Sequence, residues 1–255
     1  MAGTVRPVVL ITGASSGIGE AVAERFAVDS PRRWRLLLAG RDQERLEAVV
    51  RRMGGAGLLG DLGESAGVER LAEQALEREG RVDVLVAAAG IGWAGPFTEM
   101  PGAAVERLVA VNLTGVVQLV RLLLPGMVER GVGRVVLISS MAGCVGVANE
   151  AVYAATKGGL SAFAESLRYE LAGTRVRVTT VLPGAVDTPF FAHRGAPYHR
   201  DLPRPVPARR VADVVWRAVV HGRDDDKFVP AWLEAPARVR GAAPGFFRAM
   251  AKRFG

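Results

Sequence analysis

The chain has 255 residues, 49% of them hydrophobic and 23% charged, which fits one large folded domain better than two small ones and argues against disorder except at the ends. The net charge is +7, but no nucleic-acid-binding motif and no interleaved aromatic residues accompany it, which argues against a nucleic-acid partner. Cys144 is the only cysteine, so an intramolecular disulfide is excluded and a reducing compartment, the cytoplasm, is expected.

The sequence also argues against export and against a membrane span. The N-terminus lacks the charged start, the long apolar stretch and the cleavage site of a secretory signal. A membrane span needs about 18 apolar residues, and the apolar segment VVQLVRLLLPGMV is interrupted by Arg121 and Pro125. We therefore expect no transmembrane helix.

Short apolar runs alternate with amphipathic segments along the chain, which is the pattern of a parallel sheet covered by helices. The runs lack polar alternation, as expected for strands buried on both faces. Strands are predicted at 6–12, 33–40, 57–62, 81–89, 133–140, 175–183 and 227–232, and helices at 17–28, 42–53, 64–79, 102–129, 151–172 and 207–221. The expected fold class is α/β, a doubly wound parallel sheet of about seven strands with helices on both faces.

The first predicted strand runs into a glycine-rich turn and then a helix, in the sequence VVLITGASSGIGEAVAERF. Gly13, Gly17 and Gly19 let the backbone turn tightly, approach a pyrophosphate and pack the helix against the strand, while the helix N-terminus favours an anion. The spacing is G-x-x-x-G-x-G and differs from the dinucleotide fingerprint G-x-G-x-x-G. A dinucleotide site is the favoured interpretation, and a plain strand-to-helix turn is the alternative.

The end of the second predicted strand indicates which dinucleotide is bound. An NAD site would place a carboxylate there for the ribose hydroxyl, but the chain has Ala39 and Gly40, followed by Arg41, which suits a 2′-phosphate. Ser15 can add a hydrogen bond. We expect NADP(H), with NAD(H) as the alternative. Asp61, after the third strand, is expected to meet the adenine amino group, or else to cap the next helix.

Asn112 interrupts the strongly apolar helical pattern AAVERLVAVNLTGVVQLV. A buried amide needs hydrogen-bond partners, so an asparagine without them would lower stability. We expect Asn112 to belong to a polar network at the site, with a satisfied core amide as the alternative.

A tyrosine and a lysine lie four residues apart in YAATK, although the chain has only three of each residue type. Tyr153 and Lys157 therefore share one helix face, and their helix follows a strand that ends in Ser139 and Ser140. A lysine cation near a phenol lowers its pKa from about 10, so that the phenol can act as an acid or base. Ser140 is expected to hold the substrate oxygen on which the phenol acts.

Residues 184–207 are rich in proline, glycine and aromatic residues and are expected to form a substrate loop. Its aromatic residues, with Trp93, suggest a lipophilic substrate. Five arginines in and after this loop leave an anionic or carrier-bound substrate open as an alternative: Arg194, Arg200, Arg204, Arg209 and Arg210. The basic tail, 234–255, is expected to form one or two short helices that pack across a subunit interface, in preference to contacting a membrane.

Together these motifs resemble those of the classical short-chain dehydrogenases/reductases, over about residues 5–221. The resemblance implies a single Rossmann-type domain at 1–233, a homodimer or homotetramer, and a set of site residues. The implied catalytic residues are Asn112, Ser140, Tyr153 and Lys157. The implied cofactor-binding residues are Gly13, Ser15, Ser16, Gly17, Ile18, Gly19, Arg41, Asp61, Leu62, Ala89, Gly90, Tyr153, Lys157, Pro183, Gly184, Val186 and Thr188, with no metal.

The function that the resemblance implies is NADPH-dependent interconversion of a ketone or aldehyde and its alcohol, on a lipophilic substrate. A carrier-linked 3-oxoacyl reductase is one alternative, and a non-catalytic dinucleotide-sensing protein on the same fold is another. One departure from the family pattern is Ala88, which stands where an asparagine is usual. We expect it to change stability rather than abolish catalysis.

Overall fold

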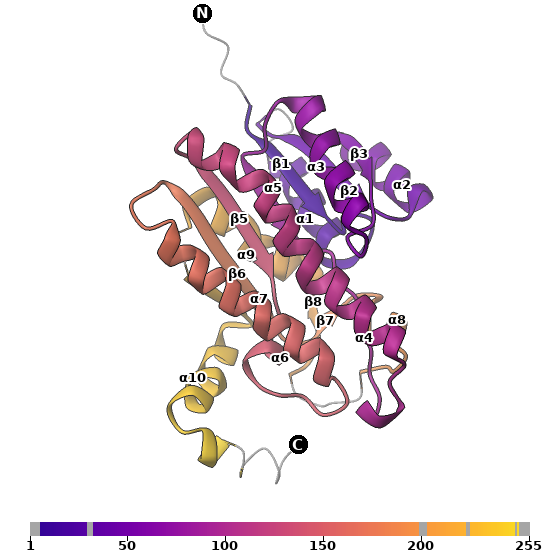
Figure 1. Cartoon of the computed structure of the whole chain (residues 1–255), viewed down its shortest axis with the longest axis vertical. Coiled ribbons are helices and arrows are strands. Elements are labelled where there is room, and N and C mark those ends of the chain that lie inside the picture. The colour runs from indigo at the N-terminus through magenta and orange to yellow at the C-terminus, as the bar shows by residue number, and fades with distance from the viewer. Residues whose placement is uncertain (1–5, 30–32, 199–202, 223–224, 248, 250–255) are drawn as a thin grey trace, which may run out of the picture.

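The computed structural model describes residues 6–29, 33–198, 203–222, 225–247 and 249. Its centre is a seven-stranded sheet in which every neighbouring pair of strands is parallel (Figure 1). The strand order is β3-β2-β1-β4-β5-β6-β9. The strands are β1 (Val8–Thr12), β2 (Arg35–Gly40), β3 (Ala56–Leu59), β4 (Val84–Ala87), β5 (Gly133–Ile138), β6 (Val176–Pro183) and β9 (Asp225–Val229). The predicted fold class and all seven predicted strands are confirmed.

The central strand β1 shows why these runs lack polar alternation. Successive side chains of a strand point to opposite faces. In β1, Val9 and Ile11 join the apolar cluster on one face of the sheet, while Val8 and Leu10 join the cluster on the other. Both faces are covered by helices, so both sets of side chains are buried.

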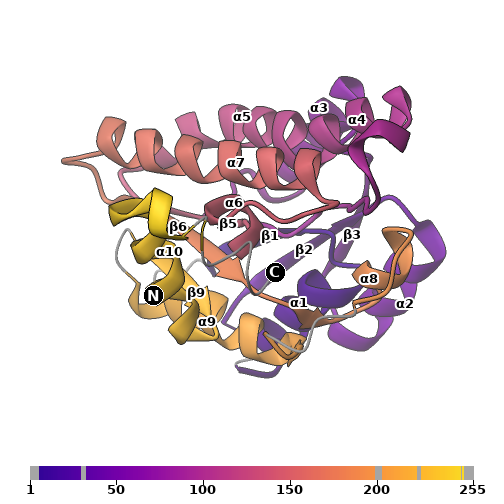
Figure 2. The same ribbon diagram turned by 90° about the horizontal axis from the view of Figure 1, so that it is seen from below.

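Two layers of helices cover the sheet (Figure 2). One face carries α3 (Ser65–Glu79), α4 (Gly102–Val109), α5 (Gly115–Glu129) and α7 (Ala151–Glu170). The other carries α1 (Gly17–Asp29), α2 (Gln43–Met53) and α9 (Ala208–His221). Each of these helices lies within or close to a predicted helical segment, so the doubly wound arrangement follows the alternation in the sequence.

The predicted helix at 102–129 is interrupted inside. A π-helical turn at Ala110–Thr114 separates α4 from α5, and Asn112 lies within it. Within the described part of the chain, Gly102–Glu129 is the one helix long and apolar enough to cross a membrane. Its most apolar 18-residue window has a mean hydropathy of 1.7. Its buried residues, including Leu119 and Leu123, pack into the core beside the sheet, so it is a core helix.

Short elements that were not predicted surround the carboxyl ends of the strands. They are α6 (Met141–Cys144), α8 (Phe190–His193), and a small parallel sheet of β7 (Val186–Asp187) and β8 (Val206–Pro207). The last three lie in or beside the predicted loop at 184–207. After β9, the chain forms α10 (Glu234–Ala242), and residues 244–247 are also helical.

Candidate active site

A cleft of about 1330 Å³ opens at the carboxyl ends of the strands. The strand order reverses between β1 and β4, and such switch points form crevices in open α/β sheets. The cleft is lined by every site residue predicted from the sequence except Gly19 and Asn112, which are buried behind it. Its volume exceeds that of a pocket for one drug-sized ligand, so it has room for a dinucleotide and a substrate together.

The glycine turn forms a close-packed cradle at one wall of the cleft. Gly13 has a φ of +66°, and a Cβ there would lie 2.8 Å from the Cα of Ala89. A Cβ at Gly19 would collide with the Gly13 carbonyl. Helix α1 begins at Gly17, so its free N–H groups lie at the cleft. This cradle fits the pyrophosphate of a dinucleotide.

The region around the second and third strands is rich in arginine. Arg41 and Arg45 line the cleft there, and Arg107 Nη2 donates to Asp61 Oδ2 at 2.5 Å. Burial raises the pKa of Asp61, but hydrogen bonds from Arg107 and Gly63, with the charge of Arg41, outweigh this effect and hold the pKa below its usual value. Sequence reasoning missed Arg45 and Arg107, since arginine is common on exposed helix faces in this chain.

Asp61 does not cap helix α3, which was the alternative to a role at the cleft. The residue at the N-cap of α3 is Glu64, whereas Asp61 Oδ1 accepts a hydrogen bond from the Gly63 N–H at 2.8 Å. The carboxylate therefore stabilises the turn before α3 while it lines the cleft.

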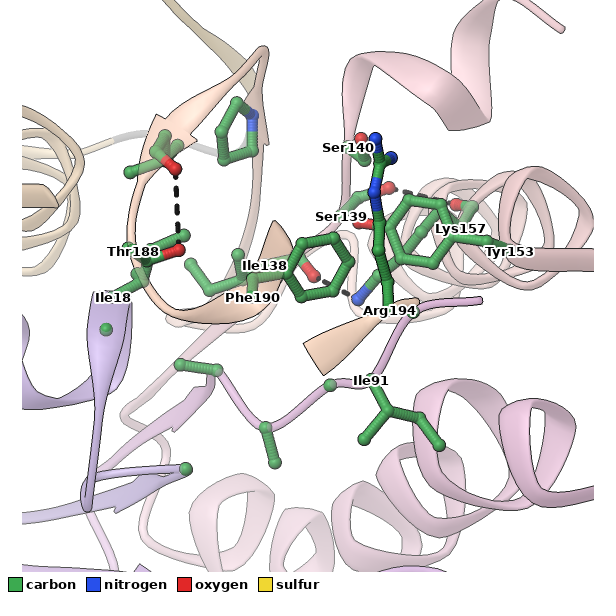
Figure 3. Close-up of a pocket in the computed structure, with 18 of the residues that line it drawn as sticks. Ile18, Ile91, Ile138, Ser139, Ser140, Tyr153, Lys157, Thr188, Phe190 and Arg194 are labelled. Atoms are coloured by element: carbon green, nitrogen blue, oxygen red, sulfur yellow. Dashed lines mark hydrogen bonds between the residues drawn. The ribbon is translucent and has the colours of Figure 1, made fainter. Parts of the chain in front are cut away.

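Tyr153 and Lys157 lie on one face of α7, as their spacing predicts. The Lys157 Nζ lies 5.9 Å from the centre of the Tyr153 ring and donates to the Ile138 carbonyl oxygen at 2.9 Å (Figure 3). Ser140 lies two residues after the end of β5 and is the N-cap of α6, where its Oγ accepts from the Ala142 N–H. Helix α7 and the segment after β5 thus bring a phenol, an ammonium group and a hydroxyl together.

The pKa values of this pair shift in directions that the sequence did not predict. Burial raises the pKa of Tyr153 to about 12, against a hydrogen bond to Ser140 that acts to lower it. Burial also lowers the pKa of Lys157 to about 8. Lys157 is not among the groups that shift the pKa of Tyr153, so the expected lowering by Lys157 is not seen in this arrangement, and desolvation sets the direction.

Asn112 is completely buried and fully engaged. Its Oδ1 accepts from the Ile91 N–H, and its Nδ2 donates to the Ile91 carbonyl and to Thr156 Oγ1. It therefore joins the loop after β4 to α7. A Cβ built on Gly90 would touch both Asn112 Oδ1 and Lys157 Nζ, which places the amide close to the lysine. A π-helical turn at such a position is common at functional sites.

The outer wall of the cleft is aromatic. Ring contacts run from Tyr153 to Phe190, then to Phe191 and Tyr198, with centroids 4.9 to 5.7 Å apart. Trp93 does not line the cleft; its ring packs against Gly95. Sequence reasoning missed four residues of the C-terminal segment that line the same cleft, namely Trp232, Leu233, Pro236 and Phe247.

The loop arginines divide into two kinds. Arg194 is buried in the cleft, where its Nη1 donates to Glu150 Oε1, whereas Arg204, Arg209 and Arg210 are exposed. Arg200 lies outside the described residues.

The single cysteine, Cys144, is half-buried at the end of α6, and burial raises the pKa of its thiol. In the described part of the chain, no group of three metal-ligating side chains occurs.

The departure at Ala88 leaves the neighbouring loop held by other bonds. The Ala89 N–H donates to Thr12 Oγ1 at 3.2 Å, and the Ala88 N–H donates to the Val86 carbonyl at the same distance. Backbone and threonine groups therefore connect the loop after β4 to the sheet.

Comparisons with known proteins identify relatives over most of the chain. The family model described as short chain dehydrogenase matches residues 7–198. An uncharacterized oxidoreductase of Myxococcus xanthus is 35% identical over 252 residues, covering 96% of each protein. A solved actinorhodin polyketide ketoreductase with NADPH has a TM-score of 0.82 and 31% identity, covering 91% of this chain and 99% of that one. A short-chain dehydrogenase/reductase from Burkholderia phymatum in complex with NAD also has a TM-score of 0.82, at 26% identity and 95% coverage of both.

Proposed function

The chain belongs to the classical short-chain dehydrogenase/reductase family and is an NAD(P)-dependent oxidoreductase acting on CH–OH and C=O groups; from this premise we propose that it uses NADPH to reduce a lipophilic ketone or aldehyde. The observation that carries this proposal is the meeting of Tyr153, Ser140 and Lys157 in a cleft that also contains the glycine cradle. Retention of all three side chains favours the enzyme over a dinucleotide sensor.

Tyr153 supplies the proton in the proposed reduction. With its pKa above neutral pH, the phenol carries its proton and can donate it to the oxygen of a carbonyl. Ser140, whose hydroxyl interacts with the phenol, orients the same oxygen. Nicotinamide, when bound, supplies the hydride. Lys157, fixed by the Ile138 carbonyl, holds the ribose beside Tyr153.

The charges around the second strand support a preference for NADPH. Arg41 and Arg45 line the cleft next to Ser15, and no acidic side chain occupies the strand end at Ala39 and Gly40. Guanidinium groups suit a 2′-phosphate, whereas NAD recognition favours a carboxylate at this place. The remaining cofactor contacts are proposed for the glycine turn, Asp61 with Leu62, Ala89 with Gly90, and Pro183, Gly184, Val186 and Thr188, all at the cleft except the buried Gly19.

The aromatic wall supports a lipophilic substrate. Phe190, Phe191 and Tyr198 offer apolar ring surface beside Tyr153. A carrier-linked 3-oxoacyl substrate is the second candidate, because Arg204, Arg209 and Arg210 stay exposed beyond the cleft and suit an acidic partner. Binding that weakens strongly with added salt would favour the carrier-linked substrate.

We propose a cytoplasmic homodimer or homotetramer. Helices α5 and α7 lie side by side on one face (Figures 1 and 2). Val109, Val128 and Tyr169 leave apolar surface exposed on this helical layer, which suits a contact between copies. Light scattering on the purified protein tests it, and a monomer at micromolar concentration would contradict it.

The activity is tested by following the loss of reduced-nicotinamide absorbance with NADPH and with NADH. The panel contains aromatic ketones, ketosteroids, long-chain aldehydes and 3-oxoacyl thioesters. We expect turnover with NADPH on at least one lipophilic carbonyl compound, and slower turnover with NADH. Turnover that favours NADH on every substrate would contradict the cofactor assignment, and thioester turnover alone would favour the carrier-linked reductase.

A further inference from the structure

Arg194 is a buried cation in the substrate part of the cleft, and the proposed chemistry leaves it without a role. Its side chain is 8% exposed, and it lines the cleft together with Glu150 and Tyr153. A buried arginine is costly to desolvate unless its charge and its hydrogen bonds are satisfied. Such a residue at a binding site indicates a function in recognition.

Three loops meet at Arg194. Its Nη1 donates to Glu150 Oε1 at 2.5 Å, which ties it to the N-terminus of α7. Its backbone carbonyl accepts from the Ala94 N–H, and a Cβ on Gly92 would lie 3.0 Å from the Arg194 Cβ, so the loop after β4 packs directly against it. The guanidinium also stacks 4.7 Å from the centre of the Phe191 ring. Its position is therefore fixed.

The guanidinium retains donors for a ligand. Arginine has five N–H groups. Among the described residues, Nε donates to the Ala196 carbonyl, Nη1 to Glu150 and Nη2 to the Pro197 carbonyl at 3.5 Å. One N–H on each terminal nitrogen has no protein acceptor there. In Figure 3 the arginine lies in the same part of the cleft as Tyr153 and Ser140.

The ion pair with Glu150 sets the kind of acceptor that fits. Because the carboxylate neutralises the guanidinium, the pair offers directed N–H groups with little net positive charge. A neutral oxygen then adds hydrogen bonds without adding charge, whereas a carboxylate ligand would add a second negative charge beside Glu150. Both charges act on the reacting phenol: after burial and the Ser140 hydrogen bond, Glu150 raises the pKa of Tyr153 and Arg194 lowers it.

We propose that Arg194, held by Glu150, binds a second, uncharged oxygen of the substrate, so that the site selects carbonyl compounds with another carbonyl near the reacting one. This inference rests on the proposed function. It makes Arg194 a specificity-determining residue and Glu150 its positioning residue.

The test compares benzoylacetone, which has a second carbonyl, with benzylacetone, which has the same skeleton and one carbonyl; benzoylacetate adds an anionic group. We expect Arg194→Met to lower kcat/KM for benzoylacetone about ten- to hundredfold through KM, as for the loss of one charge-assisted hydrogen bond. Benzylacetone is expected to change less than about threefold. Arg217→Met makes the same change at an exposed position of α9 that does not line the cleft, and it is expected to change kcat/KM for neither substrate.

Two further variants keep a folding defect apart from a loss of recognition. Arg194→Lys retains the charge and should restore part of the preference for benzoylacetone. The double variant Arg194→Met with Glu150→Gln leaves no unpaired buried charge and should behave like Arg194→Met. Equal losses of kcat/KM for benzoylacetone and benzylacetone in a folded variant would overturn the inference. A wild-type protein that prefers benzoylacetate to benzoylacetone would show that the site binds an anion, and would overturn the assignment of an uncharged acceptor.

Calorimetry separates this inference from the proposed function. The wild-type protein with NADP⁺ is titrated with each ketone, and tighter binding of benzoylacetone that is lost in Arg194→Met supports the inference even without turnover. Turnover of benzylacetone with no such difference in binding would overturn the inference and leave the reductase activity intact.

Discussion

Replacing Lys157 with methionine is expected to stabilise the protein while it removes reductase activity. The Lys157 side chain is 4% exposed, and burial lowers its pKa from 10.5 to about 8. At about 1.36 kcal/mol per pKa unit, this interval corresponds to about 3 kcal/mol of destabilisation of the native state. Methionine keeps the apolar stem but loses the hydrogen bond to the Ile138 carbonyl, which offsets about 1 kcal/mol. The expected net gain is about 2 kcal/mol at pH 7.

The pH dependence of this gain has a definite sign. Between pH 8 and 10.5 the unfolded chain still holds the lysine proton that the native protein has released, so wild-type stability rises with pH there. Below pH 8 both states hold the proton and the whole penalty is present. The advantage of Lys157→Met should therefore be full at pH 7 and shrink as the pH approaches 10.5.

Thermal unfolding without added dinucleotide measures this difference. For a chain of this size, about 2 kcal/mol corresponds to a rise in Tm of roughly 4–8 °C. Lys227→Met is the matched control, because Lys227 is 40% exposed and pairs with Asp225 on the sheet edge; it should raise Tm little. An unchanged or lower Tm for Lys157→Met at pH 7, or a gain that does not shrink above pH 8, would refute the reasoning.

Three other changes have expected outcomes. Arg41→Ala should weaken NADPH binding about ten- to hundredfold and NADH binding less than about threefold, measured by fluorescence titration; equal losses would contradict the 2′-phosphate assignment. Asn112→Ala should lower the free energy of unfolding by about 2–4 kcal/mol, because the Ile91 N–H and carbonyl lose their partners. Asn149→Gly, at an exposed residue with a φ of +65°, should have little effect in the same denaturant titration, and equal effects would argue against the network. Removing residues 244–255 takes Phe247 from the cleft wall and should raise KM for lipophilic ketones at least about threefold without changing NADPH affinity, whereas an unchanged KM would show that the tail has no part in substrate binding.

The sequence predicted the sheet well because strands buried on both faces are continuous apolar runs, and β1 and β4 are examples. Gly13, Asn112, Tyr153 and Lys157 were also recognisable, because glycine spacing and polar residues in apolar patterns depend on local sequence alone. Arg194 was identified only as one of five arginines in and after the predicted substrate loop, without its burial in the cleft, and Phe247 was not identified as a cleft residue. Their places depend on how segments far apart in the chain meet, and arginine is common elsewhere in this sequence.

The pKa of Tyr153 shows a second limit of sequence reasoning. The spacing to Lys157 correctly predicted that the two side chains are neighbours. The direction of the pKa shift depends on burial, which the spacing does not specify. The short elements α6 and α8 were missed because four-residue helices carry too little periodicity to be detected.

The most direct test of the proposed activity is NADPH oxidation by Tyr153→Phe compared with the wild-type protein, on whichever carbonyl substrate is turned over. Phenylalanine keeps the ring contact with Phe190 and removes only the hydroxyl. The proposal predicts that kcat falls by at least about a hundredfold, the range for loss of a general acid, while NADPH affinity stays within about threefold. Retention of most of the turnover by Tyr153→Phe would contradict the assignment of Tyr153 as the proton donor.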